Sequence, residues 1–179
     1  MVYILLKPGF EEIEALSAGD ILRRGEVECR FAGDGAKPVR GAHGIFVTPD
    51  MATEDLCAGS GDMIIVPGGM GGVTGIEGCE RTMGAIRAAA EAGASLGAIC
   101  AGPRVYAKLG LLEGRNITCY PGMEDEMGQA EMCDADAVSD GKIITGRAAG
   151  AAFAFGLALI TALCGEETAR RIAQEVVFR

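Results

Sequence analysis

The residue with the clearest chemical potential in this chain is Cys100, which follows an apolar run over residues 94–99. Residues 104–109, Arg-Val-Tyr-Ala-Lys-Leu, have the pattern of a short helix. A strand that turns at once into a helix bends sharply at the residue between them, and the small residues Ala98 and Gly102 leave room for that bend. The pattern is typical of a nucleophile elbow that carries a thiol in place of a serine. We therefore predict that Cys100 is a nucleophile.

The groups that can activate this thiol are limited, because the chain has a single histidine, His43. Cysteine sites of the papain or amidotransferase type take a histidine from later in the chain, whereas His43 precedes Cys100. A Cys-His pair therefore requires His43 to reach the site within the chain or across a dimer. The alternative is that His43 lies on a surface hairpin. A helix N-terminus after Cys100 would stabilise the thiolate without a histidine.

Glu14 is the second candidate for catalysis. On a helix that begins near Glu11, Glu14 shares one face with positions 18 and 21, and this face is expected to meet the sheet. A carboxylate in such a place is costly unless it is protonated or paired. A protonated Glu14 would donate a hydrogen bond to the thiolate and lower its pKa. The alternative is that Glu14, like its neighbour Glu12, only stabilises the helix dipole.

The glycine-rich segment Pro67–Gly72 resembles a phosphate-binding loop but lacks the ending Gly-Lys-Ser/Thr. The first strand is not followed by the G-x-G-x-x-G pattern of dinucleotide-binding proteins either, so we do not expect a nucleotide. Gly68 or Gly69 would instead direct a backbone N–H towards the cysteine. Together with the N–H of Ala101, this group would form an oxyanion hole.

The length and composition of the chain predict one globular domain over residues 1–179. The net charge of −9, without a compensating basic block, argues against a nucleic-acid partner. The chain has neither the features of a signal peptide nor an apolar run of about 18 residues, so we expect a cytoplasmic protein that does not enter membranes. Seven cysteines without zinc-like C-x-x-C spacing fit reduced thiols, and we expect those other than Cys100 to be inert.

Short apolar segments alternate with helical patterns along the chain. We expect strands over 2–6, 27–31, 63–66, 94–99 and 116–120, a hairpin within 37–48, two strands within 130–145, and helices over 11–24, 80–92, 104–109, 150–163 and 166–177. This alternation predicts an α/β fold with a mainly parallel sheet between helices. Ligands of such sheets bind beyond the carboxyl ends of the strands, where residues 7–14, residues 67–72 and Cys100 should converge.

Five motifs in order along nearly the whole chain resemble the ThiJ/PfpI superfamily, most closely the branch of the Parkinsonism-associated deglycase, DJ-one. These motifs are Glu11-Glu12-Ile13-Glu14, Thr48-Pro49-Asp50, Val66-Pro67-Gly68-Gly69, Ala98-Ile99-Cys100-Ala101-Gly102-Pro103 and Thr145-Gly146-Arg147. The resemblance implies a flavodoxin-like three-layer sandwich, as in class I glutamine amidotransferases, that forms a homodimer. It also implies that Cys100 is the oxidation-prone nucleophile, that Glu14 is its protonated partner, and that Gly69 and Ala101 supply oxyanion-type N–H groups.

The chain departs from the pattern of this branch at two positions. Tyr120 lies where members of the branch often have a histidine, and a phenol is a poor base because its pKa is about 10. His43 lies roughly where relatives have an arginine near the dimer interface. We therefore expect Gly68, Tyr120 and His43 to line the pocket. The protease-like branch has a histidine where this chain has Ala101, which argues against peptidase activity.

The function implied by the resemblance is that of a glyoxalase or deglycase, without metal or organic cofactor, acting on small dicarbonyls such as methylglyoxal or on their adducts. Cys100 would attack the aldehyde, and Glu14 would move protons between carbons. Two alternatives use the same thiol. One is a redox sensor or stress chaperone in which Cys100 is oxidised to the sulfinate, and the other is a small-molecule hydrolase.

Overall fold

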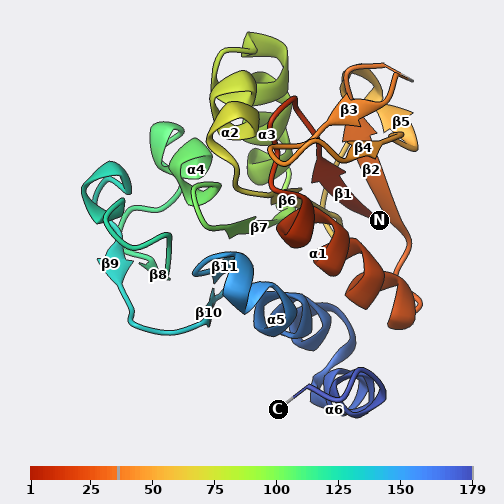
Figure 1. The fold of residues 1–179 in the computed structure, drawn as a ribbon. Coiled ribbons are helices and arrows are strands. Elements are labelled where there is room, and N and C mark those ends of the chain that lie inside the picture. The colour runs from red at the N-terminus through yellow and green to blue at the C-terminus, as the bar shows by residue number, and fades with distance from the viewer. Residues whose placement is uncertain (36, 179) are drawn as a thin grey trace.

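A computed structural model of the chain describes residues 1–35 and 37–178 and has a seven-stranded sheet at its centre (Figure 1). The strands lie in the order β10-β11-β7-β6-β1-β2-β5. Their bounds, in that order, are Ala137–Asp140, Ile143–Gly146, Ser95–Ile99, Met63–Val66, Val2–Leu5, Cys29–Gly33 and Met51–Ala52. Only the β10–β11 pair among these neighbours is antiparallel. The predicted α/β fold with a mainly parallel sheet is therefore confirmed.

Helices cover both faces of this sheet (Figure 1). One face packs against α1 (Glu12–Arg24) and α5 (Ala152–Cys164), and α6 (Glu166–Glu175) packs against α5. The other face packs against α2 (Met70–Glu77), α3 (Glu80–Glu91) and α4 (Pro103–Lys108). Within β1, Ile4 belongs to the first core and Leu5 to the second, because successive side chains of a strand point to opposite faces.

Two small sheets lie outside the central one. The predicted hairpin is confirmed as the antiparallel pair of β3 (Val39–Arg40) and β4 (Phe46–Val47). The second pair is parallel and joins β8 (Asn116–Ile117) to β9 (Glu131–Met132). The strand expected over 116–120 is thus shorter than predicted. After Ile117 the segment turns towards the elbow, where the N–H of Tyr120 donates to the carbonyl of Cys100 at 3.0 Å.

Two other expectations are corrected by the structure. The strand expected over 27–31 occupies Cys29–Gly33, because the N–H of Val27 donates to the carbonyl of Leu22 and still belongs to the end of α1. The segment after β6 is not only a loop, since α2 begins at Met70. Helix formation there buries Val73 and Ile76 in the second core, which compensates for the low helix propensity of its glycines.

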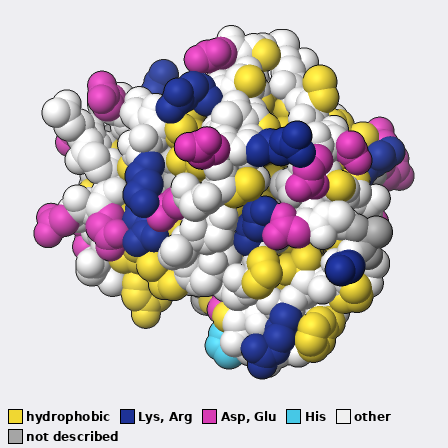
Figure 2. Space-filling model, turned by 90° about the horizontal axis from the view of Figure 1, so that it is seen from above, with side chains coloured by type: hydrophobic (Ala, Val, Ile, Leu, Met, Phe, Trp, Pro, Cys, Tyr) yellow, Lys and Arg dark blue, Asp and Glu magenta, His cyan; other side chains and the backbone are white. Residues whose placement is uncertain are grey.

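The outer surface mixes side chains of all types. In the view from above, acidic, basic and hydrophobic side chains lie next to one another over the visible face (Figure 2). Among the helices of the described residues, none combines the length and the apolar character needed to span a bilayer.

Candidate active site

Cys100 lies at the sharp turn between β7 and α4, as the elbow pattern predicts. Its φ is +63°, a left-handed conformation that is uncommon for residues with a side chain. The N–H of Cys100 donates to the carbonyl of Gly146 at 2.9 Å. A Cβ at position 102 would lie 2.3 Å from the carbonyl oxygen of Val66, so Gly102 permits the close approach of β6. The surrounding backbone therefore holds the strained residue in place.

The three segments expected at the carboxyl edge of the sheet converge there. The N–H of Glu11 donates to the carbonyl of Gly68 at 3.0 Å, and the N–H of Gly68 donates to Oε2 of Glu14 at 2.6 Å. A Cβ at position 68 would lie 2.6 Å from Oε2 of Glu14 and 3.0 Å from Sγ of Cys100. Gly68 thus leaves the space in which the carboxyl group and the thiol lie close together.

Glu14 is almost completely buried, with 1% of its surface exposed. Burial raises the pKa of its carboxyl group to about 7, although the N–H of Gly68 and the nearby thiol of Cys100 oppose this shift. Its Oε1 has no partner with hydrogen-bond geometry among the described residues. A buried carboxylate oxygen without a donor is unfavourable, so this environment favours the protonated form of Glu14. Oε1, which has no such partner, is therefore the oxygen better suited to carry that proton.

The electrostatics of Cys100 differ from the expectation that a helix end and Glu14 lower its pKa. Burial, and then the negative charge of Glu14, raise the pKa of the thiol to about 12, and the N–H of Ala101 only partly opposes them. The short helix α4 does not offset these effects. The first proton leaves this coupled pair near pH 7 and the second only in alkali. At neutral pH the thiol of Cys100 therefore keeps its proton, and a charge on sulfur requires transfer of that proton to Glu14.

A cavity of about 510 Å³ opens above this pair. Its lining consists of Glu11, Gly69, Met70, Cys100, Ala101, Tyr120, Pro121, Gly122, Met123 and Glu126. Gly69, Ala101 and Tyr120 are therefore at the pocket as expected. Gly68 lies buried beneath it, and His43 lies outside its lining.

Of the two backbone groups expected to form an oxyanion hole, that of Ala101 lies next to the thiol, and Gly69 lines the same cavity. Ala101 directs its N–H to the sulfur of Cys100. Gly69 has a φ of +82°, and a Cβ there would lie 2.3 Å from the carbonyl oxygen of Gly9. Packing against the segment after β1 is thus sufficient to explain this glycine. The oxyanion role of Gly69 and Ala101 stays a prediction.

Six residues of the cavity lining were not among the predicted site residues, namely Glu11, Met70, Pro121, Gly122, Met123 and Glu126. Glu126 ends the short helix η2 (Glu124–Glu126) and accepts a hydrogen bond from Arg104 at 2.9 Å. Arg104 also binds both carboxylate oxygens of Glu77 at 2.8 Å. This network fixes η2 at the mouth of the cavity. The network joins segments that are far apart in the chain, so the sequence does not reveal it. Of the cavity residues that were missed, only Glu11 could have been predicted, because it lies three positions before Glu14 on the same segment.

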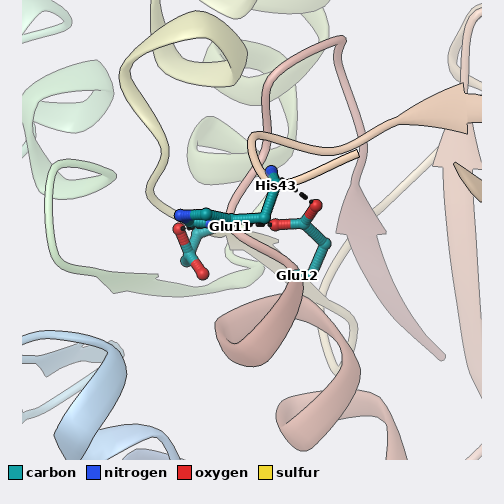
Figure 3. Close-up of side chains that lie close together, drawn as sticks. All are labelled: Glu11, Glu12 and His43. Atoms are coloured by element: carbon teal, nitrogen blue, oxygen red, sulfur yellow. Dashed lines mark hydrogen bonds and ion pairs between the residues drawn. The ribbon is translucent and has the colours of Figure 1, made fainter. Parts of the chain in front are cut away.

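His43 is largely exposed, and the backbone of its hairpin turn is bound to the start of α1 (Figure 3). The N–H of His43 donates to Oε1 of Glu12 at 2.8 Å. Its ring Nδ1 lies 3.0 Å from Oε2 of Glu12 and 3.4 Å from Oε2 of Glu11. His43 therefore contacts the rim of the cavity through Glu11 and does not reach Cys100 as a catalytic base within this chain.

Among the cysteines other than Cys100, which we predicted to be inert, Cys79 has contacts that favour its thiolate form. It immediately precedes α3, and Oγ1 of Thr82 donates to its sulfur at 3.2 Å. This hydroxyl and the backbone N–H of Thr82 lower the pKa of the Cys79 thiol, whereas that of Cys100 is raised. We expect brief treatment with iodoacetamide at pH 7.5 to label Cys79 at least about threefold faster than Cys100, measured by peptide mass spectrometry.

The variant Thr82→Val serves as the test of this cause. It keeps the shape of the side chain but removes the hydroxyl donor, so labelling of Cys79 should slow while that of Cys100 is unchanged. Faster labelling of Cys100 in the unmodified chain would contradict the prediction.

Comparison with known proteins identifies sequences related to this chain. The sequence profile described as the DJ-1/PfpI family matches residues 1–162. Protein dj-1beta of Drosophila melanogaster is 31% identical over 174 residues, which cover 96% of this chain and 93% of the relative. The glutathione-independent glyoxalase DJR-1.2 of Caenorhabditis elegans is 35% identical over 167 residues, covering 92% and 89%.

Solved structures show the same fold over almost the whole chain. The crystal structure of Drosophila melanogaster DJ-1beta has a TM-score of 0.89 at 29% identity and covers 99% of this chain and 97% of that chain. Oxidized Toxoplasma gondii DJ-1 has a TM-score of 0.90, also at 29% identity, and covers the same shares of the two chains.

Proposed function

The chain belongs to the DJ-1/PfpI family, and on that basis we propose that it is a cysteine-dependent enzyme of the glyoxalase or deglycase type. Its substrates would be dicarbonyls such as methylglyoxal or their adducts, and its chemistry would need no metal or organic cofactor. The name of the Caenorhabditis elegans relative, a glutathione-independent glyoxalase, supports this activity class. The observation that carries the proposal is a buried carboxyl group with an unpartnered oxygen beside the elbow cysteine.

The proposed reaction uses the proton shared by this pair. Sγ of Cys100 attacks the aldehyde carbon, and the oxygen is stabilised by the N–H groups of Gly69 and Ala101 and becomes protonated, giving a hemithioacetal. Glu14 takes the proton from that carbon and returns one to the neighbouring carbonyl carbon, which gives a 2-hydroxy thioester. Water then cleaves the thioester and restores the thiol. The sum is dicarbonyl plus water giving a hydroxy acid, so no oxidant or reductant is consumed.

The size of the cavity also bears on the substrate. A cavity of about 510 Å³ lies in the range of sites for drug-sized ligands, and a three-carbon dicarbonyl fills only a small part of it. This space supports the inclusion of larger dicarbonyl adducts among the candidate substrates.

The experiment is to incubate the purified protein with methylglyoxal, without glutathione and in the presence of a chelator, and to measure lactate. Lactate formation proportional to protein concentration is expected. A rate equal to that of the protein-free solution would overturn the proposal for methylglyoxal, and the same assay with a methylglyoxal-modified arginine derivative tests the adducts.

A second candidate, oxidation sensing by Cys100, is supported by the oxidized state of the Toxoplasma gondii relative. Peroxide would oxidise the thiolate to the sulfenic and then the sulfinic acid, and each step would consume one peroxide and release water. A protonated Glu14 would donate to a sulfinate oxygen and stabilise this product. Mass spectrometry after mild peroxide treatment should then show addition of two oxygens at Cys100, and oxidation confined to other cysteines would refute this role.

All seven cysteines are free thiols, which supports the proposal of a reducing location such as the cytoplasm.

Exposed hydrophobic side chains on α1 and the β3–β4 hairpin support the proposed homodimer. Ile13, Ile45 and Phe46 are more than half exposed, and the N–H of Ile45 donates to Oε1 of Glu12 next to Ile13. These residues therefore form one patch, and exposed apolar patches often mark interfaces.

We expect Phe46→Asp to weaken this dimer at least about 100-fold, because a carboxylate would be buried in an apolar contact. Sedimentation velocity over a range of protein concentrations measures the shift to monomer. Phe153→Asp is the matched control, since Phe153 is also an exposed phenylalanine but lies on α5. If Phe153→Asp weakens the dimer and Phe46→Asp does not, the interface does not include the patch around Phe46.

A further inference from the structure

One segment forms half of the lining of the cavity above Cys100. This wall segment, residues 120–126, supplies five of the ten lining residues, namely Tyr120, Pro121, Gly122, Met123 and Glu126. We propose that Arg104, which lies outside the lining, is a positioning residue that holds the wall segment and thereby limits the size of the compound that reaches the thiol. The inference rests on the proposed function as far as it concerns substrates, whereas the wall segment itself can be tested without turnover.

The wall segment is attached at both ends to the elbow and to the helix that follows it. At its start, the N–H of Tyr120 donates to the carbonyl of Cys100 at 3.0 Å. At its end, Nη1 of Arg104 donates to Oε2 of Glu126 at 2.9 Å. Between these attachments the segment is held by its own turns, in which the N–H of Met123 donates to the carbonyl of Tyr120 at 3.1 Å. The contact with Arg104 therefore decides how the far end of the segment lies relative to the thiol.

Arg104 itself is held rigidly. Its Nε and Nη2 donate to the two carboxylate oxygens of Glu77 at 2.8 Å each, and its side chain is 14% exposed. Glu77 is 6% exposed and also accepts from Nζ of Lys108 at 2.7 Å. A bidentate pair fixes the plane of a guanidinium group, so Nη1 of Arg104 points in one direction, towards Glu126. The ammonium group of a lysine cannot bind both carboxylates in this planar arrangement.

The same guanidinium group connects the wall segment to another part of the cavity lining. Helix α2 ends at Glu77 and begins at Met70, which lines the cavity. Helices α2 and α4 lie side by side (Figure 1). Arg104 on α4 thus joins α2 to the wall segment, and the separation of these two parts sets the width of the cavity.

Loss of the contact between Arg104 and Glu126 should widen the cavity without unfolding the chain. Glu126 is 47% exposed, and ion pairs in such places contribute little to stability. Met127, which follows the wall segment, is buried in the second core and would still hold the chain there. The end of the wall segment would therefore move while the core stays in place, and bulky compounds would gain more access to Cys100 than small ones.

Two maleimides of different size measure this access. N-methylmaleimide and N-pyrenylmaleimide carry the same reactive group, so the ratio of their rates at Cys100 reports the width of the path and not the pKa of the thiol. Glu126→Met keeps the bulk of the side chain but removes the acceptor. In this variant the rate with the pyrenyl reagent relative to the methyl reagent should rise at least about threefold, a change within the range for loss of one partly exposed ion pair. Peptide mass spectrometry measures both rates.

A second variant tests whether Arg104 and Glu126 act through one contact. Arg104→Lys leaves a cation beside Glu77 but removes the planar fork, so it should raise the ratio as Glu126→Met does. The double variant should exceed either single variant by less than about 1.5-fold, because the same contact is already lost. Additive effects of the two substitutions would overturn the proposal. If Arg104→Lys does not fold, as judged by circular dichroism, the result for Glu126→Met decides.

Two controls come from the same short helix. Asp125 is an exposed acidic residue of η2 that is not a partner of Arg104, and Asp125→Asn should leave the ratio unchanged. Glu126→Gln retains an oxygen that can accept from Arg104 and should behave like the unmodified chain. An unchanged ratio in Glu126→Met overturns the proposal, and so does an equal rise in Asp125→Asn.

Lactate formation from methylglyoxal, measured on the same proteins, separates this proposal from the proposed function. A raised ratio in Glu126→Met, in a chain that forms no lactate, supports the role of Arg104 and refutes only the activity. An unchanged ratio in an active chain refutes only the role of Arg104.

Discussion

Replacing Cys100 by serine is expected to lower kcat/KM for methylglyoxal at least about 1,000-fold, to the level of the protein-free reaction. Serine keeps the approximate shape of the side chain, but its hydroxyl is far less acidic than a thiol, and Glu14 cannot hold its proton at neutral pH. The left-handed backbone at position 100 is unchanged, so the variant should fold normally. Lactate formation under substrate-limiting conditions measures the effect.

Cys133→Ser is the control for this prediction. Cys133 is also partly buried, but it lies outside the lining of the cavity that contains Cys100. Its substitution should change kcat/KM by less than about twofold. Retention of most of the activity in Cys100→Ser would show that another group is the nucleophile, and loss of activity in both variants would indicate damage to the fold.

The main features of this site could be predicted because they depend on local sequence. A short apolar strand, a small-residue turn and a helix specify the elbow at Cys100. The alternation of strands and helices then specifies the sheet edge at which Glu14, Gly68 and Cys100 meet. Each step uses neighbouring residues or a general rule of parallel sheets.

What escaped prediction depends on contacts between distant segments. The position of Glu126 follows from its ion pair with Arg104, and no periodic pattern in the sequence records that pair. The burial of Glu12 follows from the space at Gly41. The direction of the pKa shift of Cys100 was predicted wrongly, because the desolvation of its side chain outweighs the N–H of Ala101 and is not visible in the sequence.

Replacing Glu14 by glutamine is expected to lower kcat/KM about 100- to 10,000-fold, the range of a lost general acid and base. Glutamine retains a carbonyl oxygen that can accept from the N–H of Gly68, so the side chain should keep its place beneath the pocket. It cannot take a proton from carbon or return one. Glu12→Gln is an instructive comparison, since Glu12 is also buried but faces the hairpin, and it should retain catalysis if Glu14 acts specifically.

The pH dependence of thiol labelling separates this role of Glu14 from a structural one. In the unmodified chain the pair loses its first proton near pH 7, so alkylation of Cys100 should increase through that value and then level off. In Glu14→Gln the thiol itself must lose the first proton. Burial still holds its pKa up, so the inflection should move above about pH 8.5, the value for an ordinary thiol. An inflection that stays near pH 7 in the variant would mean that Glu14 does not share its proton with Cys100, and proton transfer in the reaction would have to be assigned to another group.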